Sequence, residues 1–208
     1  MSARPHRIGL VVAVVGAAAG LAAGYVGLVT GALAPDLNVG RRTRRLGPQV
    51  VQVDASRDLV FDMIAAPYKE RQPRALADKV RVLDRSEDMV LAAHRTPVRG
   101  RLVATTVETV RFSRPERVDF RLVRGSVPYV VERFILTADS GGARLTYDGE
   151  LGTDLSGLGE RWGDIVAERW ERAVASSLAA VRAEAQRRTG PAQTRNVTAH
   201  TEIGDPPP

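Results

Sequence analysis

Four side chains in the middle of this 208-residue chain have the chemistry to exchange a proton with a bound molecule: Glu108, Glu132, Tyr147 and His94. Each glutamate shares the alternation phase of apolar neighbours in a strand-like run. A carboxyl group on an inward sheet face is costly to bury without a partner, and burial raises its pKa toward neutrality. Such a group is a candidate general acid or base, with Tyr147, His94 or Arg133 as its partner.

The alternation does not decide which face of the sheet these acids occupy. Acidic residues in antiparallel strands commonly face solvent and pair with arginines on neighbouring strands. In that arrangement Glu108 and Glu132 would have no catalytic role. The two alternatives predict opposite burial for the same side chains.

Other chemistries find little support in the sequence. It contains no cysteine, and its three histidines, His6, His94 and His200, have no neighbour at a metal-ligand spacing. It also lacks a glycine-rich phosphate loop after a strand and a nucleophile elbow around a serine. We therefore predict no metal site and no cofactor.

Strand-like runs with short, turn-forming separators surround the four candidate residues. Short separators favour hairpins and therefore an antiparallel meander. A short strand at 49–53 comes first, followed by a helix that Ser56 is expected to cap and Pro67 to end. The six later runs are 80–85, 89–96, 101–112, 117–124, 129–137 and 143–151.

A long helix is predicted from Gly157 to Arg188. This stretch contains no proline, and apolar residues recur on one helical face, among them Trp162, Val166 and Trp170. A helix of about 30 residues is roughly 45 Å long and needs a broad surface to cover its apolar face. The preceding strands are the expected surface.

The first part of the chain reads as a membrane anchor. A basic leader at 1–7 precedes an uncharged apolar run at 8–34, which is long enough to cross a bilayer as a helix. A cleaved signal peptide is the alternative, because Ala32-Leu33-Ala34 looks like a cleavage site. The length of the run and the following Pro35 favour a retained transmembrane helix.

Charge after this run predicts the orientation. A basic linker at 35–48 carries an excess of positive charge over the leader, so the positive-inside rule predicts a single-pass cell-membrane protein with a cytoplasmic globular part. The linker arginines are expected to contact membrane lipids. They are Arg41, Arg42, Arg44 and Arg45.

Two further partner predictions follow from the pattern of glycines and charges. Small residues on one face of the apolar helix predict a homodimer, unless they only reflect a glycine-rich composition. The net charge of +6 comes from arginines that are mostly scattered among acids, so nucleic acid is not an expected partner. The small residues are Gly20, Gly24, Gly27 and Gly31.

The order of elements resembles the helix-grip fold of the START/Bet v 1-like (SRPBCC) superfamily, which includes polyketide cyclase/dehydrase and lipid-transport proteins. The resemblance covers about 49–188, from VQVDAS at 51–56 and VFDMI at 60–64 to LTYDGEL at 145–151. It implies an α+β domain in which a curved antiparallel sheet of about seven strands grips the C-terminal helix. The tail at 189–208 lacks an apolar period and is expected to be disordered.

The resemblance also implies an apolar ligand held between helix and sheet. The residues expected to line that space are Trp162, Val166, Trp170, Leu102, Ala104, Thr106, Phe120 and Leu122. A solid core is the alternative, because aromatic residues at helical spacing usually only pack. Three functions remain: a membrane-anchored binder or carrier of a lipid-, quinone- or polyketide-like molecule, a cyclase or dehydratase using a buried acid–base residue, and a non-enzymatic membrane assembly module.

Overall fold

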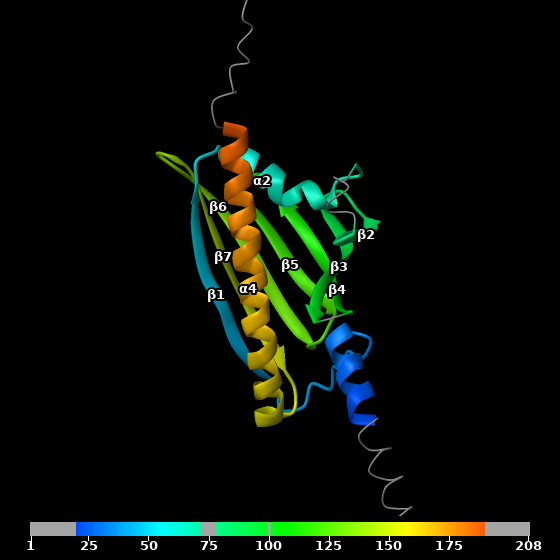
Figure 1. Cartoon of the computed structure of the whole chain (residues 1–208). Coiled ribbons are helices and arrows are strands. Elements are labelled where there is room, and N and C mark those ends of the chain that lie inside the picture. The colour runs from blue at the N-terminus through cyan, green and yellow to red at the C-terminus, as the bar shows by residue number, and fades with distance from the viewer. Residues whose placement is uncertain (1–19, 72–77, 100, 190–208) are drawn as a thin grey trace, which may run out of the picture.

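The computed structural model describes residues 20–71, 78–99 and 101–189. The predicted leader, the first part of the predicted transmembrane run and all of the predicted disordered tail after Thr189 lie outside the described residues. Within them, one sheet, one long helix and two short helices form a single core (Figure 1).

The sheet has seven antiparallel strands in the order β1-β7-β6-β5-β4-β3-β2, which confirms the predicted meander. Because β1 pairs with β7, the first strand joins the edge next to the last one. Six of the predicted runs match their strands within three residues at each end. The strands are β1 (Arg42–Val53), β2 (Val80–Arg85), β3 (Met89–Arg99), β4 (Leu102–Ser113), β5 (Arg117–Arg124), β6 (Tyr129–Asp139) and β7 (Gly142–Thr153).

Strand β1 begins seven residues before the predicted start, at Arg42 rather than Gln49, so half of the predicted linker belongs to the sheet. Proline cannot donate a ladder hydrogen bond, which argued against a strand through Pro48. The register with β7 shifts between Leu46 and Gln49, and this irregularity accommodates Pro48 within one continuous strand.

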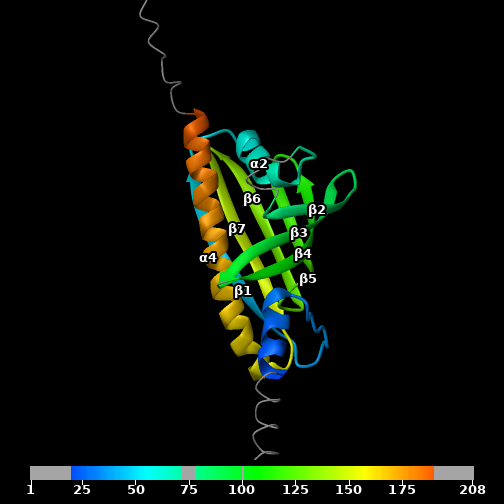
Figure 2. The same cartoon turned by 45° about the vertical axis from the view of Figure 1, so that its right-hand side comes forward.

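Helix α4 (Ser156–Thr189) lies lengthwise along the curved inner face of the sheet, mainly over β1 and β7 (Figures 1 and 2). Its buried residues include Val166, Val174 and Leu178, as the helical stripe predicted. On the sheet they meet a core that includes the fully buried Leu145 and Leu151 of β7. The long helix and the sheet therefore form one hydrophobic core.

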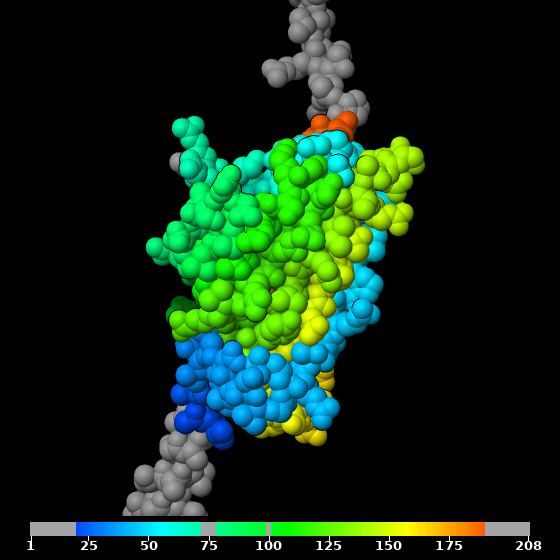
Figure 3. Space-filling model, turned by 180° about the vertical axis from the view of Figure 1, so that it is seen from behind, coloured from blue at the N-terminus to red at the C-terminus, as the bar shows by residue number. Residues whose placement is uncertain are grey.

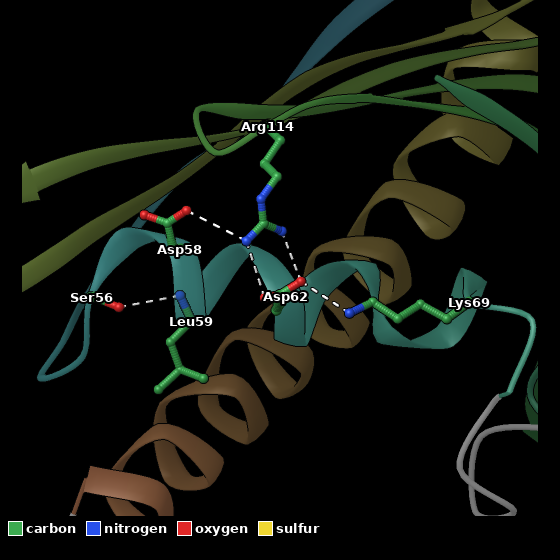
Figure 4. Close-up of polar contacts among 6 residues, drawn as sticks. All are labelled: Ser56, Asp58, Leu59, Asp62, Lys69 and Arg114. Atoms are coloured by element: carbon green, nitrogen blue, oxygen red, sulfur yellow. Dashed lines mark hydrogen bonds and ion pairs between the residues drawn. The ribbon is translucent and has the colours of Figure 1, made fainter. Parts of the chain in front are cut away.

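Helix α2 (Arg57–Ala65) and the 3₁₀ turn η1 (Ala66–Tyr68) close one end of the sheet. The Ser56 hydroxyl accepts a hydrogen bond from the Leu59 amide, which confirms the predicted cap. In Figure 4 Arg114, from the β4–β5 turn, reaches Asp62 at 2.8 Å. Hydrogen bonds from Arg114 are the main cause that lowers the pKa of Asp62 to about 2.

The segment before β1 packs against the domain. Residues 20–30 are helical, and Gly31 then adopts a left-handed conformation (φ +72°) against Thr105 and Gly125. The predicted helix to residue 34 therefore ends early, at Thr30. Among the residues described here, no helix is both long and apolar enough to cross a membrane.

The four-glycine face predicted for a homodimer is broken in this arrangement. Gly27 lies against the Leu33 side chain, and Gly31 sits in the turn after the helix. Gly20 and Gly24 alone keep open space around them. In this conformation the four glycines do not form one helical face through which two copies could pack.

Asp154, at the end of β7, fastens the segment before β1 to the start of α4. Its carboxylate accepts hydrogen bonds from the amides of Leu37 (2.7 Å) and Asn38 (2.9 Å) and from Arg41 Nε (2.8 Å). These bonds lower the pKa of Asp154, with the Arg41 side chain as the main cause. The first part of the predicted linker at 35–48 is thus tied to the domain.

Candidate functional site

The sheet places all four candidate residues on its inner face. Glu108 and Glu132 are 5% and 8% exposed, Tyr147 is fully buried and His94 is half-buried. Arg133 points to the other face, where its Nε lies 2.6 Å from Asp148. The alternative with solvent-facing acids is therefore wrong for Glu108 and Glu132, and Arg133 is not their partner.

Glu132 of β6 joins the sheet to the long helix. Its Oε1 atom accepts hydrogen bonds from the Tyr147 hydroxyl and from Trp170 Nε1, both at 2.6 Å. Burial, and next the charge of Glu108, raise the pKa of Glu132 to about 7. Burial also raises the pKa of Tyr147, so the hydroxyl stays protonated and donates.

His94 of β3 and Glu108 of β4 form a second polar group. His94 Nδ1 lies 2.9 Å from Glu108 Oε2, and His94 Nε2 lies 3.0 Å from the Tyr68 hydroxyl. Burial alone lowers the pKa of His94, but the adjacent Glu108 carboxylate outweighs it, so the pKa of His94 is raised. The neighbouring Glu108 thus favours the protonated form of His94.

Tyr68 was missed by sequence reasoning. The residue follows Pro67, where the pattern predicted only the end of a helix, and the local sequence has no alternation that marks an inward ring. The turn η1 places the ring inside, where burial raises its pKa well above that of free tyrosine. A lone aromatic residue beside a helix-ending proline was the one available signal.

Aromatic rings connect the two polar groups across the inner face. Phe120 of β5 contacts Phe134 of β6 at 5.5 Å between ring centroids, and Phe134 contacts Tyr147 at 5.2 Å. On its other side Phe120 lies near Tyr68, at 6.2 Å. The result is an apolar surface with a carboxyl group near one end and a histidine–carboxylate pair near the other.

The predicted ligand wall is brought together only in part. Val166 is buried in the core under α4, while Trp162 and Trp170 are partly buried, with Trp162 Nε1 bonded to Ser126 O at 2.8 Å. The predicted strand positions are likewise half-buried, because α4 packs mainly over β1 and β7. They are Leu102, Ala104, Thr106, Phe120 and Leu122.

Two hollows of the described residues lie elsewhere. One, of about 220 Å³, lies between residues 30–32, Val103, Thr105, Val107 and Arg124. The other, of about 550 Å³, is open and lies on the first turns of α4, at Gly157, Leu158, Glu160, Arg161 and Asp164. Neither contains a residue of the predicted wall, so the inner face is a half-covered surface in this conformation. No three potential metal ligands converge within the described part of the chain.

No family model and no curated protein matches the sequence. Solved structures do match in three dimensions. The Zhui aromatase/cyclase from Streptomyces sp. R1128 superposes with a TM-score of 0.57 at 19% identity, over 71% of this chain and 95% of that chain. The chain has the helix-grip fold. The START/Bet v 1-like resemblance is thereby confirmed in architecture.

Two further matches show how widely this helix-grip fold is used. Norcoclaurine synthase from Thalictrum flavum gives a TM-score of 0.52 at 12% identity, over 70% of this chain and 87% of that chain. Ara h 8.0201 gives 0.52 at 11% identity, over 71% and 99%. The Zhui aromatase/cyclase, norcoclaurine synthase and Ara h 8.0201 share this architecture. The roles of residues in this chain must therefore be argued from its own geometry.

Proposed function

We propose that this helix-grip protein binds an apolar small molecule that carries a hydroxyl or carbonyl group. The observation that supports it most is the half-covered apolar inner face that ends at Glu132, whose pKa is raised to about 7. Apolar walls with a few placed polar groups are typical of small-molecule sites. The ligand would lie on Phe120 and Phe134 and direct its polar group to Glu132.

The free oxygen of Glu132 favours this assignment. Both hydrogen bonds to Glu132 reach Oε1, and no side chain of the described residues bonds Oε2. In the described part of the chain, every side-chain nitrogen or oxygen that is fully buried has a hydrogen-bond partner, so the unbonded Oε2 is not fully buried. Water or a ligand can therefore contact Oε2. A carboxylate that only stabilises a solid core would not need an accessible oxygen.

A second candidate function is proton-transfer catalysis of the cyclase or dehydratase type. An acid with a pKa near 7 can donate and accept a proton at neutral pH. In this role Glu132 would exchange the proton with the ligand, while the hydrogen bonds from Tyr147 and Trp170 hold the Glu132 side chain in place. The hydrogen-bonded His94 and Glu108 would offer polar contacts to the far part of the molecule.

The predicted membrane anchor completes the proposal. The uncharged run at 8–34 would hold the domain at the cell membrane, with the domain in the cytoplasm according to the flanking arginines. Arg42 and Arg44 pair with Glu160 (3.5 Å) and Asp164 (2.6 Å) of α4, both on the surface. Surface ion pairs are weak, so these arginines can still contact lipid headgroups, as the sequence predicted.

The experiment is a binding measurement on the full chain in mild detergent. Solvent extraction with mass spectrometry should find a copurified apolar compound. 1-Naphthol, an apolar ring system with one hydroxyl, should quench Trp170 fluorescence in a Trp162→Phe background and saturate. The surface control Val50→Ala should bind equally, whereas Glu132→Ala should weaken binding. No copurified compound and no saturable quenching would refute the binding function.

A further inference from the structure

Large apolar side chains are exposed mainly at one end of the molecule. Six of the eight that are at least half exposed among the described residues come from the segment before β1 and from the start of α4. They are Leu21 (77%), Leu33 (51%), Leu37 (55%), Val39 (61%), Leu155 (50%) and Leu158 (71%). We call these six residues the apolar end.

The two segments that carry the apolar end lie side by side. The Leu155 amide donates to Val39 O at 2.8 Å, and the Leu37 amide donates to Asp154 just before Leu155. Tyr25 meets Trp162 of α4 edge-on, at 6.4 Å between ring centroids. Figures 1 and 3 show the segment beside the first turns of α4, away from the end closed by α2.

The length of the uncharged run determines what this surface faces. A bilayer core about 30 Å thick needs about 20 helical residues. Residues 8–19 would span only about 18 Å as a helix at 1.5 Å per residue. The next residues of the run, up to Gly31, pack against the domain through Tyr25 and Gly31. If the run enters the bilayer, the end of the domain that holds its second half must come with it.

We propose that the apolar end of the folded domain is seated in the lipid bilayer interface. The partner is the lipid surface itself, which covers Leu155, just before α4, and Leu158 of α4 together with the segment before β1. Exposed apolar surface rimmed by polar residues is typical of such contacts. The contact does not require anionic lipid, because the six side chains of the apolar end carry no charge and neutral lipid can cover them.

The absence of cysteine from the chain allows a direct test. Leu158→Cys and, as a second position, Val39→Cys are labelled with an environment-sensitive fluorophore in the full chain. The chain is reconstituted in phosphatidylcholine vesicles with and without phosphatidylglycerol. The control is Leu83→Cys on β2, which is 46% exposed and lies far from the apolar end. A nitroxide-bearing phosphatidylcholine, with the nitroxide high in the acyl chain, is the quencher.

The proposal predicts a blue shift and loss of most of the emission at both positions of the apolar end, with little change at Leu83. Removing phosphatidylglycerol should not matter. Equal quenching at all three positions, or none, overturns the proposal. A requirement for phosphatidylglycerol would assign the contact to the arginines and also overturn it. A blue shift that depends on protein concentration but resists the lipid quencher would indicate a second copy instead. None of these outcomes depends on small-molecule binding at Glu132.

Discussion

Replacing Glu132 by glutamine tests whether the buried carboxyl titrates as the geometry requires. Glutamine has nearly the same volume, and its Oε1 can accept the bonds that Tyr147 and Trp170 now donate. The substitution removes the ionisable group and little else. Burial and the Glu108 charge raise the pKa of Glu132 from 4.5 to about 7, so the carboxyl is predominantly protonated at pH 5 and ionised at pH 8.

The folded chain favours the protonated form of Glu132, so its stability falls as the pH rises. The pKa of Glu132 is higher in the folded than in the unfolded chain, so its effect on stability is absent below pH 4.5 and grows as a penalty up to about pH 7. The pKa difference of about 2.5, at about 1.4 kcal/mol for each pKa unit, corresponds to about 3 kcal/mol. Of this, about 2.5 kcal/mol falls between pH 5 and pH 8.

Urea unfolding of the full chain in mild detergent, followed by circular dichroism at pH 5 and pH 8, measures this penalty. The wild type should lose about 2.5 kcal/mol more than Glu132→Gln as the pH rises. The raised pKa of His94 also removes stability with rising pH, but it does so in both proteins. Glu168→Gln, an exposed carboxylate on α4, should follow the wild type. Equal losses in wild type and Glu132→Gln would refute the buried titrating carboxyl.

Three further perturbations follow from the contacts around the site. Arg114→Gln should lower the free energy of unfolding by about 1 kcal/mol in urea at pH 7. Because the pKa of Asp62 is about 2, this difference between variant and wild type should disappear as the pH falls from 3.8 through 2. A difference that persists below pH 2 would contradict the ion pair. Gly31→Ala, whose new Cβ would lie 2.4 Å from Thr105 O, should speed hydrogen exchange in residues 20–40 and leave β5–β7 protected; unchanged exchange would contradict it. Asp154→Asn should cost about 3 kcal/mol, because it removes a nearly buried charge from its ion pair with Arg41. A cost near zero in the same unfolding assay would mean that Asp154 does not hold the segment before β1.

The strands and the long helix were predictable because each carries a strong local pattern. Alternation over β2 to β7 and helical periodicity in α4 both reflect burial of one face, and burial is what the sheet and helix satisfy in three dimensions. The start of β1 at Arg42 was not predictable, since its polar residues pair with β7 and with acids of α4 that lie far away in the sequence. A contact made across more than 100 residues leaves no local signal.

The candidate site divides in the same way. Alternation placed Glu108 and Glu132 in phase with apolar neighbours, but it does not tell which face of the sheet points inward. That direction is visible only in the folded chain, where Trp170 of α4 bonds Glu132 and His94 of β3 contacts Glu108. Trp170 was predicted as a ligand wall, and its Nε1 instead holds Glu132. Which ring atoms point at which carboxylate depends on how α4 lies over the sheet, a tertiary property.

The position of α4 also explains why the two proposed functions, ligand binding and proton transfer, both rely on Glu132. The helix covers β1 and β7 closely and leaves the inner face of β4 and β5 half-buried, so Glu132 on β6 stands at the boundary between the dry core and the open surface. On the dry side it is held by Tyr147 and Trp170, and burial raises its pKa. On the open side its second oxygen can be touched by water or a ligand. A carboxyl deeper in the core could meet no ligand, and one fully in solvent would have no raised pKa, so this boundary is the place where an acid of the proposed kind can work.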